Sequence, residues 1–195
     1  MMSFNRLAIA VVLCATVATG AGRHIHLDDR YMVDLEITGE GDAAKIKLEL
    51  NVTTTGYVGF GINVNGTMQG ADLFIGGVNA DGVYYGDYIG TGHEWPTRDQ
   101  VQNWNATGEE KDGVTPLTIE RFLDTKDPNN EDIKIENSNI YVIWSIGETD
   151  DLNHHGNGNR GAQQLNLMAD DSGTGTTTVS VGVLLIGLVA AMFQN

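Results

Sequence analysis

Two long loops carry the side chains that offer the most chemistry. Segment 148–161 holds the adjacent pair His154 and His155 among glycines and asparagines, and segment 63–70 holds Met68 at its apex. Imidazole nitrogens bind metals, and two adjacent histidines can also capture adventitious ions. A methionine in a loop commonly fills an irregular apolar gap. Because long loops inside a compact domain are usually functional or disordered, both segments are candidates for a binding site.

The sequence lacks the motifs of most self-sufficient enzymes. It contains no His-Glu-x-x-His pair, no glycine-rich phosphate loop and no nucleophile elbow, and its one cysteine, Cys14, lies in the N-terminal segment described next. Acidic residues are numerous, but no spacing places two of them around a substrate. The net charge of −15 is scattered along the chain and disfavours binding to nucleic acid. We expect a chain that is not an enzyme by itself and binds no nucleic acid.

Residues 1–22 have the three parts of a secretory signal peptide. One positive charge, Arg6, precedes an apolar run from Leu7 to Val17 and then a stretch of small residues. The alternative is a membrane anchor, but a helix of that length rises only about 16 Å against a hydrocarbon core of about 30 Å. We expect cleavage near Gly20 or Gly22 and passage through the secretory pathway.

A second apolar run, 179–193, closes the sequence. A spacer of glycine and threonine precedes it, and the small residues Asp171, Ser172 and Gly173 precede the spacer. This order is typical of a glycosylphosphatidylinositol (GPI) signal, so we expect the lipid on Ser172, with Asp171 or Gly173 as alternative sites. The other interpretation is a C-terminal transmembrane helix, which would bring the threonines 176–178 into the bilayer. With either anchor the mature chain lies on the extracellular face of the plasma membrane.

The segment between the two ends, residues 23–170, has the size of one domain. It is acidic and free of cysteine, so its core must be stable without disulfides. Sequons begin at Asn51, Asn65 and Asn105 and are open to glycosylation on the secretory route.

Within this segment, strand periodicity dominates. Residues 44–52 alternate apolar and polar, residues 33–37 do the same, and the turn 39–42 predicts that they form a hairpin. Stretch 140–144 is apolar on both faces and predicts a central strand. Further strands are predicted at 57–63, 72–78, 83–89, 117–122, 140–146 and 163–168, with a turn at 79–82. About eight or nine short strands favour a β-sandwich, with a barrel as the alternative.

Several motifs in the same order resemble the DOMON family, over Tyr31 to Met168. They are Gly56-Tyr-Val-Gly-Phe-Gly-Ile-Asn63, Gly66-Thr-Met-Gln-Gly-Ala-Asp-Leu-Phe-Ile-Gly76, Leu123-Asp-Thr-Lys-Asp-Pro128, Val142-Ile-Trp-Ser-Ile-Gly147, and His155-Gly156 with Arg160-Gly161. The chain is most similar in character to the module that precedes the copper domains in dopamine β-monooxygenase-like proteins. The resemblance implies an all-β, immunoglobulin-like sandwich, which we expect to have about eight to eleven strands.

The family resemblance also implies one of two functions: holding a b-type haem for electron transfer, or binding a small ligand such as a sugar. In haem-binding members the iron is held by a methionine after the Gly-Phe-Gly strand and a histidine before the last strand. The matching positions here are Met68 and His155, with His154 as the alternative, and the family's loops close over the same end of the sandwich. Gly59 and Gly61 would leave a strip without side chains that a flat macrocycle could approach, or serve sheet packing alone.

Our leading hypothesis is therefore a surface-anchored DOMON module that binds haem b and passes single electrons to a separate redox partner. One alternative is a binding module for a carbohydrate or another small ligand. Its stacking candidates are Tyr57, Tyr84, Tyr85, Trp95 and Trp104. A third hypothesis is a stand-alone relative of dopamine β-monooxygenase-like proteins that lacks the copper catalytic domains.

Overall fold

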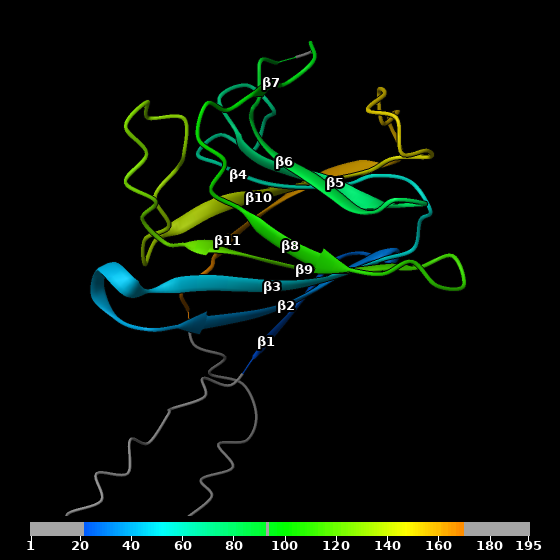
Figure 1. Cartoon of the computed structure of the whole chain (residues 1–195). Helices are drawn as coiled ribbons and strands as arrows, with labels where there is room; N and C mark the ends of the chain where they lie inside the picture. The colour runs from blue at the N-terminus through cyan, green and yellow to red at the C-terminus, as the bar shows by residue number, and fades with distance from the viewer. Residues whose placement is uncertain (1–21, 93, 170–195) are drawn as a thin grey trace, which may run out of the picture.

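The computed structural model describes residues 22–92 and 94–169, which form two antiparallel sheets packed face to face (Figure 1). The five-stranded sheet has the order β1 (Arg23–Asp28), β2 (Tyr31–Thr38), β3 (Lys45–Val52), β9 (Thr115–Phe122), β8 (Asn105–Gly108). The six-stranded sheet has the order β11 (Arg160–Asn166), β10 (Asn139–Ile146), β4 (Val58–Asn63), β5 (Asp72–Asn79), β6 (Gly82–Ile89), β7 (Thr97–Arg98). The predicted all-β sandwich is confirmed, with eleven strands.

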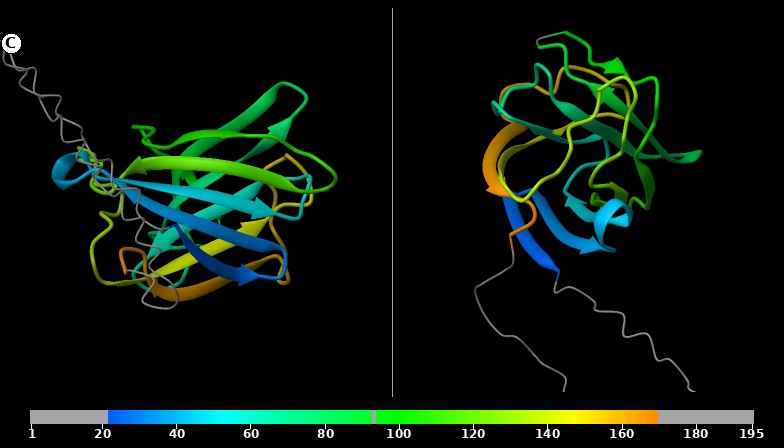
Figure 2. Two further views of the ribbon diagram at one scale, coloured as in Figure 1. Left: turned by 90° about the horizontal axis from the view of Figure 1, so that it is seen from below. Right: turned by 90° about the vertical axis from the view of Figure 1, so that its left-hand side faces the viewer.

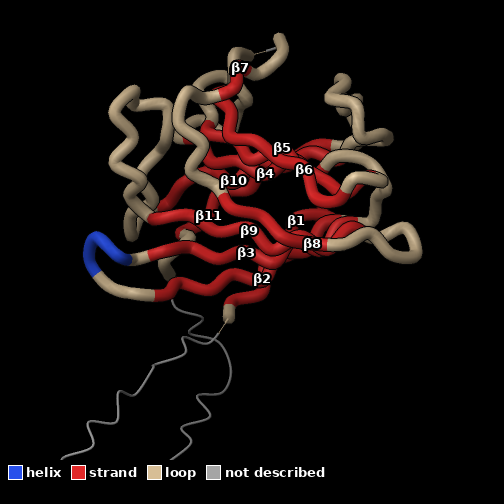
Figure 3. Tube along the Cα trace, viewed as in Figure 1, coloured by secondary structure: helices blue, strands red, loops and turns tan. Residues whose placement is uncertain are grey.

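The predicted hairpins are also confirmed. β2 pairs with β3 from Tyr31 opposite Val52 to Thr38 opposite Lys45, and the turn between them contains a short 3-10 helix, η1 (Gly41–Ala43), coloured blue in Figure 3. β10 lies between β11 and β4, as its two apolar faces predicted. Within residues 22–92 and 94–169, no helix has the length and hydropathy needed to cross a membrane.

Three strands were not predicted, and each has a weak sequence signal. β7 has only two residues, β8 reads Asn-Ala-Thr-Gly, and β1 begins at the expected cleavage region. β1 nevertheless closes one side of the sandwich, because it lies beside β11 in both views of Figure 2. The Arg23 guanidinium donates a hydrogen bond to the backbone oxygen of Asn166, which ties the two ends of the domain together.

The hydrophobic core fills the space between the two sheets. Alternate residues of the longer strands point inward and are buried; they include Val33, Leu35, Ile46, Leu48, Leu50, Leu117 and Ile119 from one sheet and Val58, Phe60, Ile62, Phe74, Val142, Trp144 and Ile146 from the other. Each large apolar side chain buried in this way stabilises the fold by about 1.5–3 kcal/mol. The Tyr31 hydroxyl donates to the backbone oxygen of Gly59 across the core, at 3.0 Å.

Strand β4 is buried along its whole length. Its apolar residues point into the core, while Gly59 and Gly61 present bare backbone on the outer face of the six-stranded sheet. A Cβ on Gly59 would overlap the Ser145 hydroxyl, and one on Gly61 would come within 2.5 Å of the Leu73 side chain. Neighbouring side chains therefore lean over both glycines, and a larger residue at either position would displace them.

The Met68 loop, residues 63–71, is fixed by backbone hydrogen bonds to Gly90. Gly70 N–H donates to the Gly90 oxygen at 2.8 Å, and Gly90 N–H donates to the Ala71 oxygen at 2.8 Å. A Cβ on Gly90 would overlap the backbone oxygen of Met68. Because the obstacle is backbone rather than a flexible side chain, position 90 has no room for an alanine.

We therefore predict that Gly90→Ala lowers the free energy of unfolding by about 1–3 kcal/mol, the usual cost of forcing an extra methyl group into a packed site. Urea unfolding followed by circular dichroism measures this. Gly158→Ala is the matched control because a Cβ there meets no neighbouring atom, so its effect should stay within about 0.5 kcal/mol. Equal effects of the two substitutions would contradict this packing at Gly90.

Candidate cofactor site

A cavity of about 640 Å³ lies on the outer face of the six-stranded sheet. Its floor is built from the outward-facing residues of β4, β5, β10 and β11, and its walls come from three loops. The lining residues include Gly59, Gly61, Leu73, Ile143, Ser145 and Ala162 in the floor and Met68, Trp95, Asn153, His154, His155 and Arg160 in or beside the loops. The volume is typical of a site for a small ligand or cofactor.

The two loops predicted to carry ligands reach this cavity from opposite ends of the sheet. β4 and β10 are antiparallel, with Asn63 opposite Tyr141 and Val58 opposite Ile146. The Met68 loop leaves the Asn63 end, whereas the His155 loop leaves the Ile146 end. The expectation that both loops close over the same end of the sandwich is therefore wrong. Residues of both loops nevertheless line the one cavity on the outer face of the six-stranded sheet.

Asn63 organises the Met68 loop from inside. Its buried carboxamide donates to the backbone oxygens of Thr67, at 2.7 Å, and Gln69, at 2.9 Å, on either side of Met68. The Asn63 side-chain oxygen also accepts the Asn65 N–H at 2.7 Å. These three hydrogen bonds define the path of the loop and direct Met68 into the cavity lining.

Tyr57 holds the opposite loop. Its backbone N–H donates to the Thr149 oxygen at 3.0 Å, and its hydroxyl donates to the Asn153 oxygen at 2.7 Å. Burial raises the pKa of the Tyr57 hydroxyl above its ordinary value, so the group remains a donor at physiological pH. The loop base is also fixed by Arg30, whose guanidinium donates to the Gly158 oxygen at 2.9 Å.

The two adjacent histidines have different hydrogen bonds. His155 Nδ1 lies 2.9 Å from the backbone oxygen of Gly156, which can only accept, so the proton is assigned to Nδ1 and Nε2 keeps its lone pair. His154 Nδ1 accepts the Gly156 N–H at 3.0 Å, so a neutral His154 carries its proton on Nε2. The geometry thus leaves a free Nε2 lone pair on His155 and not on neutral His154.

Burial also favours the neutral form of His155. The ring is half-buried, and this burial lowers the pKa of His155; the Gly156 carbonyl acts in the opposite direction, and the charge of Arg160 lowers the pKa further. His154, by contrast, is exposed. His155 is therefore unprotonated at Nε2 near neutral pH, which is the state that a metal requires of an imidazole.

The structure divides the remaining candidates. Trp95 and Tyr57 line the cavity, and Trp95 is 60% exposed. Trp104 is buried in the core and stacks against the Arg121 guanidinium, so its ring is not available for stacking on a ligand. The sequon residues Asn51, Asn65 and Asn105 are all exposed. The predicted signal peptide and the lipid sites Asp171, Ser172 and Gly173 lie outside the described residues, apart from Gly22.

Sequence reasoning missed Asn63 and Gly90, which position the Met68 loop through hydrogen bonds to its backbone. An asparagine that ends a strand and precedes a loop is a known signal for a local side-chain turn, and it could have identified Asn63. The role of Gly90 could be found only from the structure, because Gly90 and Met68 belong to separate segments of the sequence that the fold brings together.

Comparisons with known proteins agree with this architecture. A family model described as "DOMON domain" matches residues 27–147. "DBH-like monooxygenase protein 1" of Gallus gallus is 34% identical over 80% of this chain and 26% of its own length, and the Homo sapiens protein of the same name is 31% identical over 80% and 26%. "MOXD1 homolog 2" of Drosophila melanogaster is 33% identical over 62% of this chain and 16% of its own length.

The chain spans about a quarter of the length of the two DBH-like relatives. Among solved structures, the cytochrome b domain of pyranose dehydrogenase from Coprinopsis cinerea shares the fold, with a TM-score of 0.59 and 11% identity over 74% of this chain and 80% of that chain. The family model matches all of β2 to β10 and so covers most of both sheets. The motifs described above follow one another along the chain in the order that the family has. This chain belongs to the DOMON domain family.

Proposed function

We propose that the protein binds haem b in the outer-face cavity, with Met68 and His155 as the axial iron ligands, and passes single electrons to a separate partner. The observation that carries this proposal is the convergence of the two side chains on one cavity. Met68 and His155 are 87 positions apart in sequence and belong to loops from opposite ends of the sheet, yet both line the same space.

The donor set fits this cofactor. A methionine thioether and a neutral imidazole are a known axial pair for b- and c-type iron centres, and His155 has its Nε2 lone pair available. The Gly156 carbonyl that accepts the Nδ1 proton fixes the ring's tautomer and orientation, as outer hydrogen bonds do at metal sites. Gly59 and Gly61 leave room for the side chains of Ser145, Leu73 and Ile143 that cover them. Leu73 and Ile143 make the cavity floor apolar.

Haem, when bound, supplies a one-electron couple between ferric and ferrous iron. The contribution of this chain is to hold the ligands in place and exclude water. Because Met68 and His155 would both hold the iron, no open coordination site would remain for a small molecule such as oxygen, which would favour electron transfer over oxygen activation. The apolar floor would disfavour the extra charge on ferric iron and so raise the reduction potential. The thioether of Met68 would also raise the reduction potential, because it favours ferrous iron.

The solved structure that shares the fold is a cytochrome b domain, and this likeness supports the proposal. The relatives named as DBH-like monooxygenases extend far beyond the region matched here. We therefore do not transfer their hydroxylation chemistry to this chain, and we propose a role as a module that receives or delivers electrons.

We predict that the purified protein, given haem, shows a sharp Soret band and narrow α and β bands when reduced, as a six-coordinate low-spin centre does. Met68→Ala should leave a five-coordinate, high-spin haem with a lower reduction potential, because the thioether stabilises the ferrous state. His155→Ala should lose the haem during gel filtration, because imidazole is the stronger ligand. Visible absorption spectra and a redox titration measure both effects.

His154→Ala is the matched control, since the neighbouring ring lines the same cavity but has its Nδ1 occupied by the Gly156 N–H. It should keep the wild-type spectrum. Loss of haem in His154→Ala with retention in His155→Ala would assign the ligand to the other ring. A wild-type protein with no haem spectrum would refute the proposed function.

A small-ligand site is the second candidate, and the position of Trp95 favours it. This indole is 60% exposed while lining the cavity, and exposed aromatic rings beside a cavity are suited to stacking on sugars and flat apolar ligands. In that case the aromatic ring, rather than Met68 and His155, would control binding. The spectra described above separate the two functions.

The proposal also includes attachment to the extracellular face of the plasma membrane through a GPI lipid at Ser172. The two ends of the described domain lie together, since Arg23 hydrogen-bonds to Asn166. The cavity loops lie on the opposite side of the domain, over the outer face of the six-stranded sheet (Figure 1). This arrangement would direct the cavity away from the membrane, toward a soluble partner.

We predict that phosphatidylinositol-specific phospholipase C releases the protein from intact cells, because the enzyme cuts the lipid to which Ser172 would be joined. Immunoblotting of the medium measures the release. Recovery of peptide 179–193 from the mature, membrane-bound protein would contradict the GPI anchor and favour the transmembrane alternative.

A further inference from the structure

The sheet register pairs two tyrosines of β6 with two glycines of β5. Tyr84 lies opposite Gly77, and Tyr85 lies opposite Gly76. Side chains alternate between the two faces of a strand, so the tyrosines point to opposite sides of the six-stranded sheet. Tyr85 points inward and stacks on the core residue Phe74, with the ring centroids 6.1 Å apart. Tyr84 therefore lies on the outer face, which is the face that carries the cavity.

Gly77 gives the Tyr84 ring the room to cross β5. A Cβ at position 77 would come within 2.5 Å of the Tyr84 hydroxyl oxygen and 2.8 Å of the ring carbon that bears it. The ring thus lies directly over the bare backbone of the neighbouring strand. From there the hydroxyl reaches the His155 loop, residues 147–159, where it donates to Asp150 Oδ1 at 2.9 Å. The backbone oxygen of Asp150 lies 3.4 Å from the same hydroxyl.

The hydroxyl of Tyr84 is suited to be a permanent donor in this contact. Its acceptor is a carboxylate, and hydrogen bonds to charged groups are stronger than those between neutral groups. The Tyr84 side chain is half-buried, although Asp150 is exposed. Burial raises the pKa of the Tyr84 hydroxyl, and the hydrogen bond to Asp150 raises it further, so the group keeps its proton at physiological pH.

The other end of β6 holds the Met68 loop. Gly90, which directly follows β6, accepts the Gly70 N–H at 2.8 Å and donates to the Ala71 oxygen at 2.8 Å. Tyr84 and Gly90 are six residues apart, which is about 20 Å along an extended strand. One continuous strand therefore fastens both of the loops that carry the proposed iron ligands, and its length sets the distance between the two points of attachment.

β4 has the same arrangement. Tyr57, just before β4, donates to the Asn153 oxygen in the His155 loop, and Asn63, the last residue of β4, donates to the backbone of the Met68 loop. β4 and β6 both pair antiparallel with β5, so they run in the same direction. The two ligand loops are thus held by two strands, one on each side of β5.

We propose that Tyr84 is a positioning residue for His155 and acts through its hydrogen bond to Asp150. The inference rests on the proposed function for the role of His155 as a ligand, whereas the attachment of the loop can be measured without haem. A loop held from β6 as well as from β4 samples fewer arrangements, so the imidazole would meet the iron at a smaller cost in conformational entropy. Tyr84, a stacking candidate in the sequence, would thus act on the cavity from outside its lining.

The first measurement is amide hydrogen exchange, resolved by NMR, on the mature protein without haem. The Tyr57 N–H donates to the Thr149 oxygen, beside Asp150, at 3.0 Å. It should exchange about fivefold faster in Tyr84→Phe than in the wild type, the usual effect of removing one hydrogen bond. The Gly70 N–H, at the other end of β6, should keep its exchange rate. An unchanged thermal midpoint would separate this local release from a general loss of stability.

The second measurement is the rate at which the haem-loaded protein loses haem to excess apomyoglobin. Tyr84→Phe should keep the wild-type spectrum, because both ligands remain, but should lose haem about fivefold faster. Asp150→Asn keeps an acceptor oxygen and should stay close to the wild type, whereas Asp150→Ala should match Tyr84→Phe. The double variant should be no worse than either single variant, because both changes remove the same hydrogen bond. Tyr85→Phe is the matched control, since this adjacent ring faces the core.

The outcomes separate this inference from the proposed function. Wild-type exchange of the Tyr57 amide in Tyr84→Phe, additive effects of Tyr84→Phe and Asp150→Ala, or an equal effect of Tyr85→Phe would overturn the role of Tyr84. Faster exchange without faster loss of haem would also overturn it, because the loop would be held without positioning the ligand. A wild type that takes up no haem would refute the proposed function, and faster Tyr57 exchange in Tyr84→Phe would then still support the attachment of the loop to β6.

Discussion

Burial of β4 on both faces is the constraint on which the rest of the structure depends. Its inner residues, Val58, Phe60 and Ile62, must be apolar because they pack against the opposite sheet. Its outer residues, Gly59 and Gly61, must be small because the side chains of Ser145, Leu73 and Ile143 close over them. The strand therefore joins the core to the cavity floor, and a change on either face is transmitted to the other through the same backbone.

The cavity depends on loops that residues of the sandwich hold in place. Asn63 and Gly90 fix the Met68 loop, and Tyr57 and Arg30 fix the opposite loop. Within residues 22–92 and 94–169, no hydrogen bond joins the two loops, so a ligand that bridges them would gain affinity from positions already set by the scaffold. This is a physical reason why two residues from opposite ends of a sheet can serve one site.

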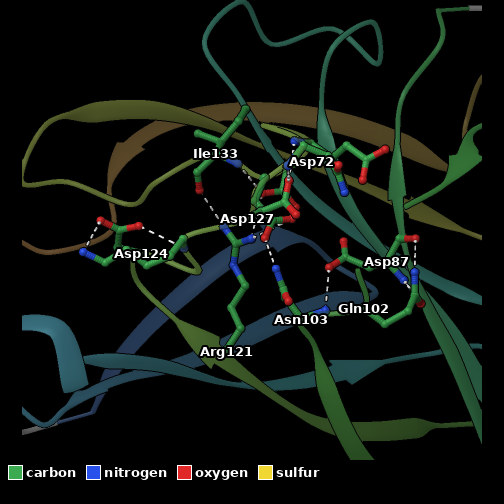
Figure 4. A network of polar contacts seen from close by, with 12 residues as sticks. Asp72, Asp87, Gln102, Asn103, Arg121, Asp124, Asp127 and Ile133 are labelled. Atoms are coloured by element: carbon green, nitrogen blue, oxygen red, sulfur yellow. Dashed lines mark hydrogen bonds and ion pairs between the residues drawn. The ribbon is translucent and has the colours of Figure 1, made fainter. Parts of the chain in front are cut away.

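Much of the fold follows from residue alternation, which is why the β2–β3 hairpin and the interior position of β10 could be predicted from the sequence. The short edge strands β7 and β8 could not, because neither has enough alternating residues to form a pattern. Met68 and His155, which the family motifs singled out, both line the cavity, but the direction from which each loop arrives depends on the pairing of β4 with β10. The buried polar network around Arg121 (Figure 4) had no local signature, since Asp72, Asp87 and Asp132 come from separate segments and are joined only by the packed structure.

The most direct test of the central claim is a haem titration of protein labelled with ¹³C at the methionine methyl groups, followed by NMR in the reduced state. The account predicts that the spectrum stops changing at one haem per chain and that one methyl signal moves far upfield, because a thioether bound to the iron lies over the ring current of the macrocycle. That signal should be missing from Met68→Leu. Methionine signals that all keep their positions at saturation, or a shifted signal that survives in Met68→Leu, would contradict the assignment of Met68 as a haem ligand.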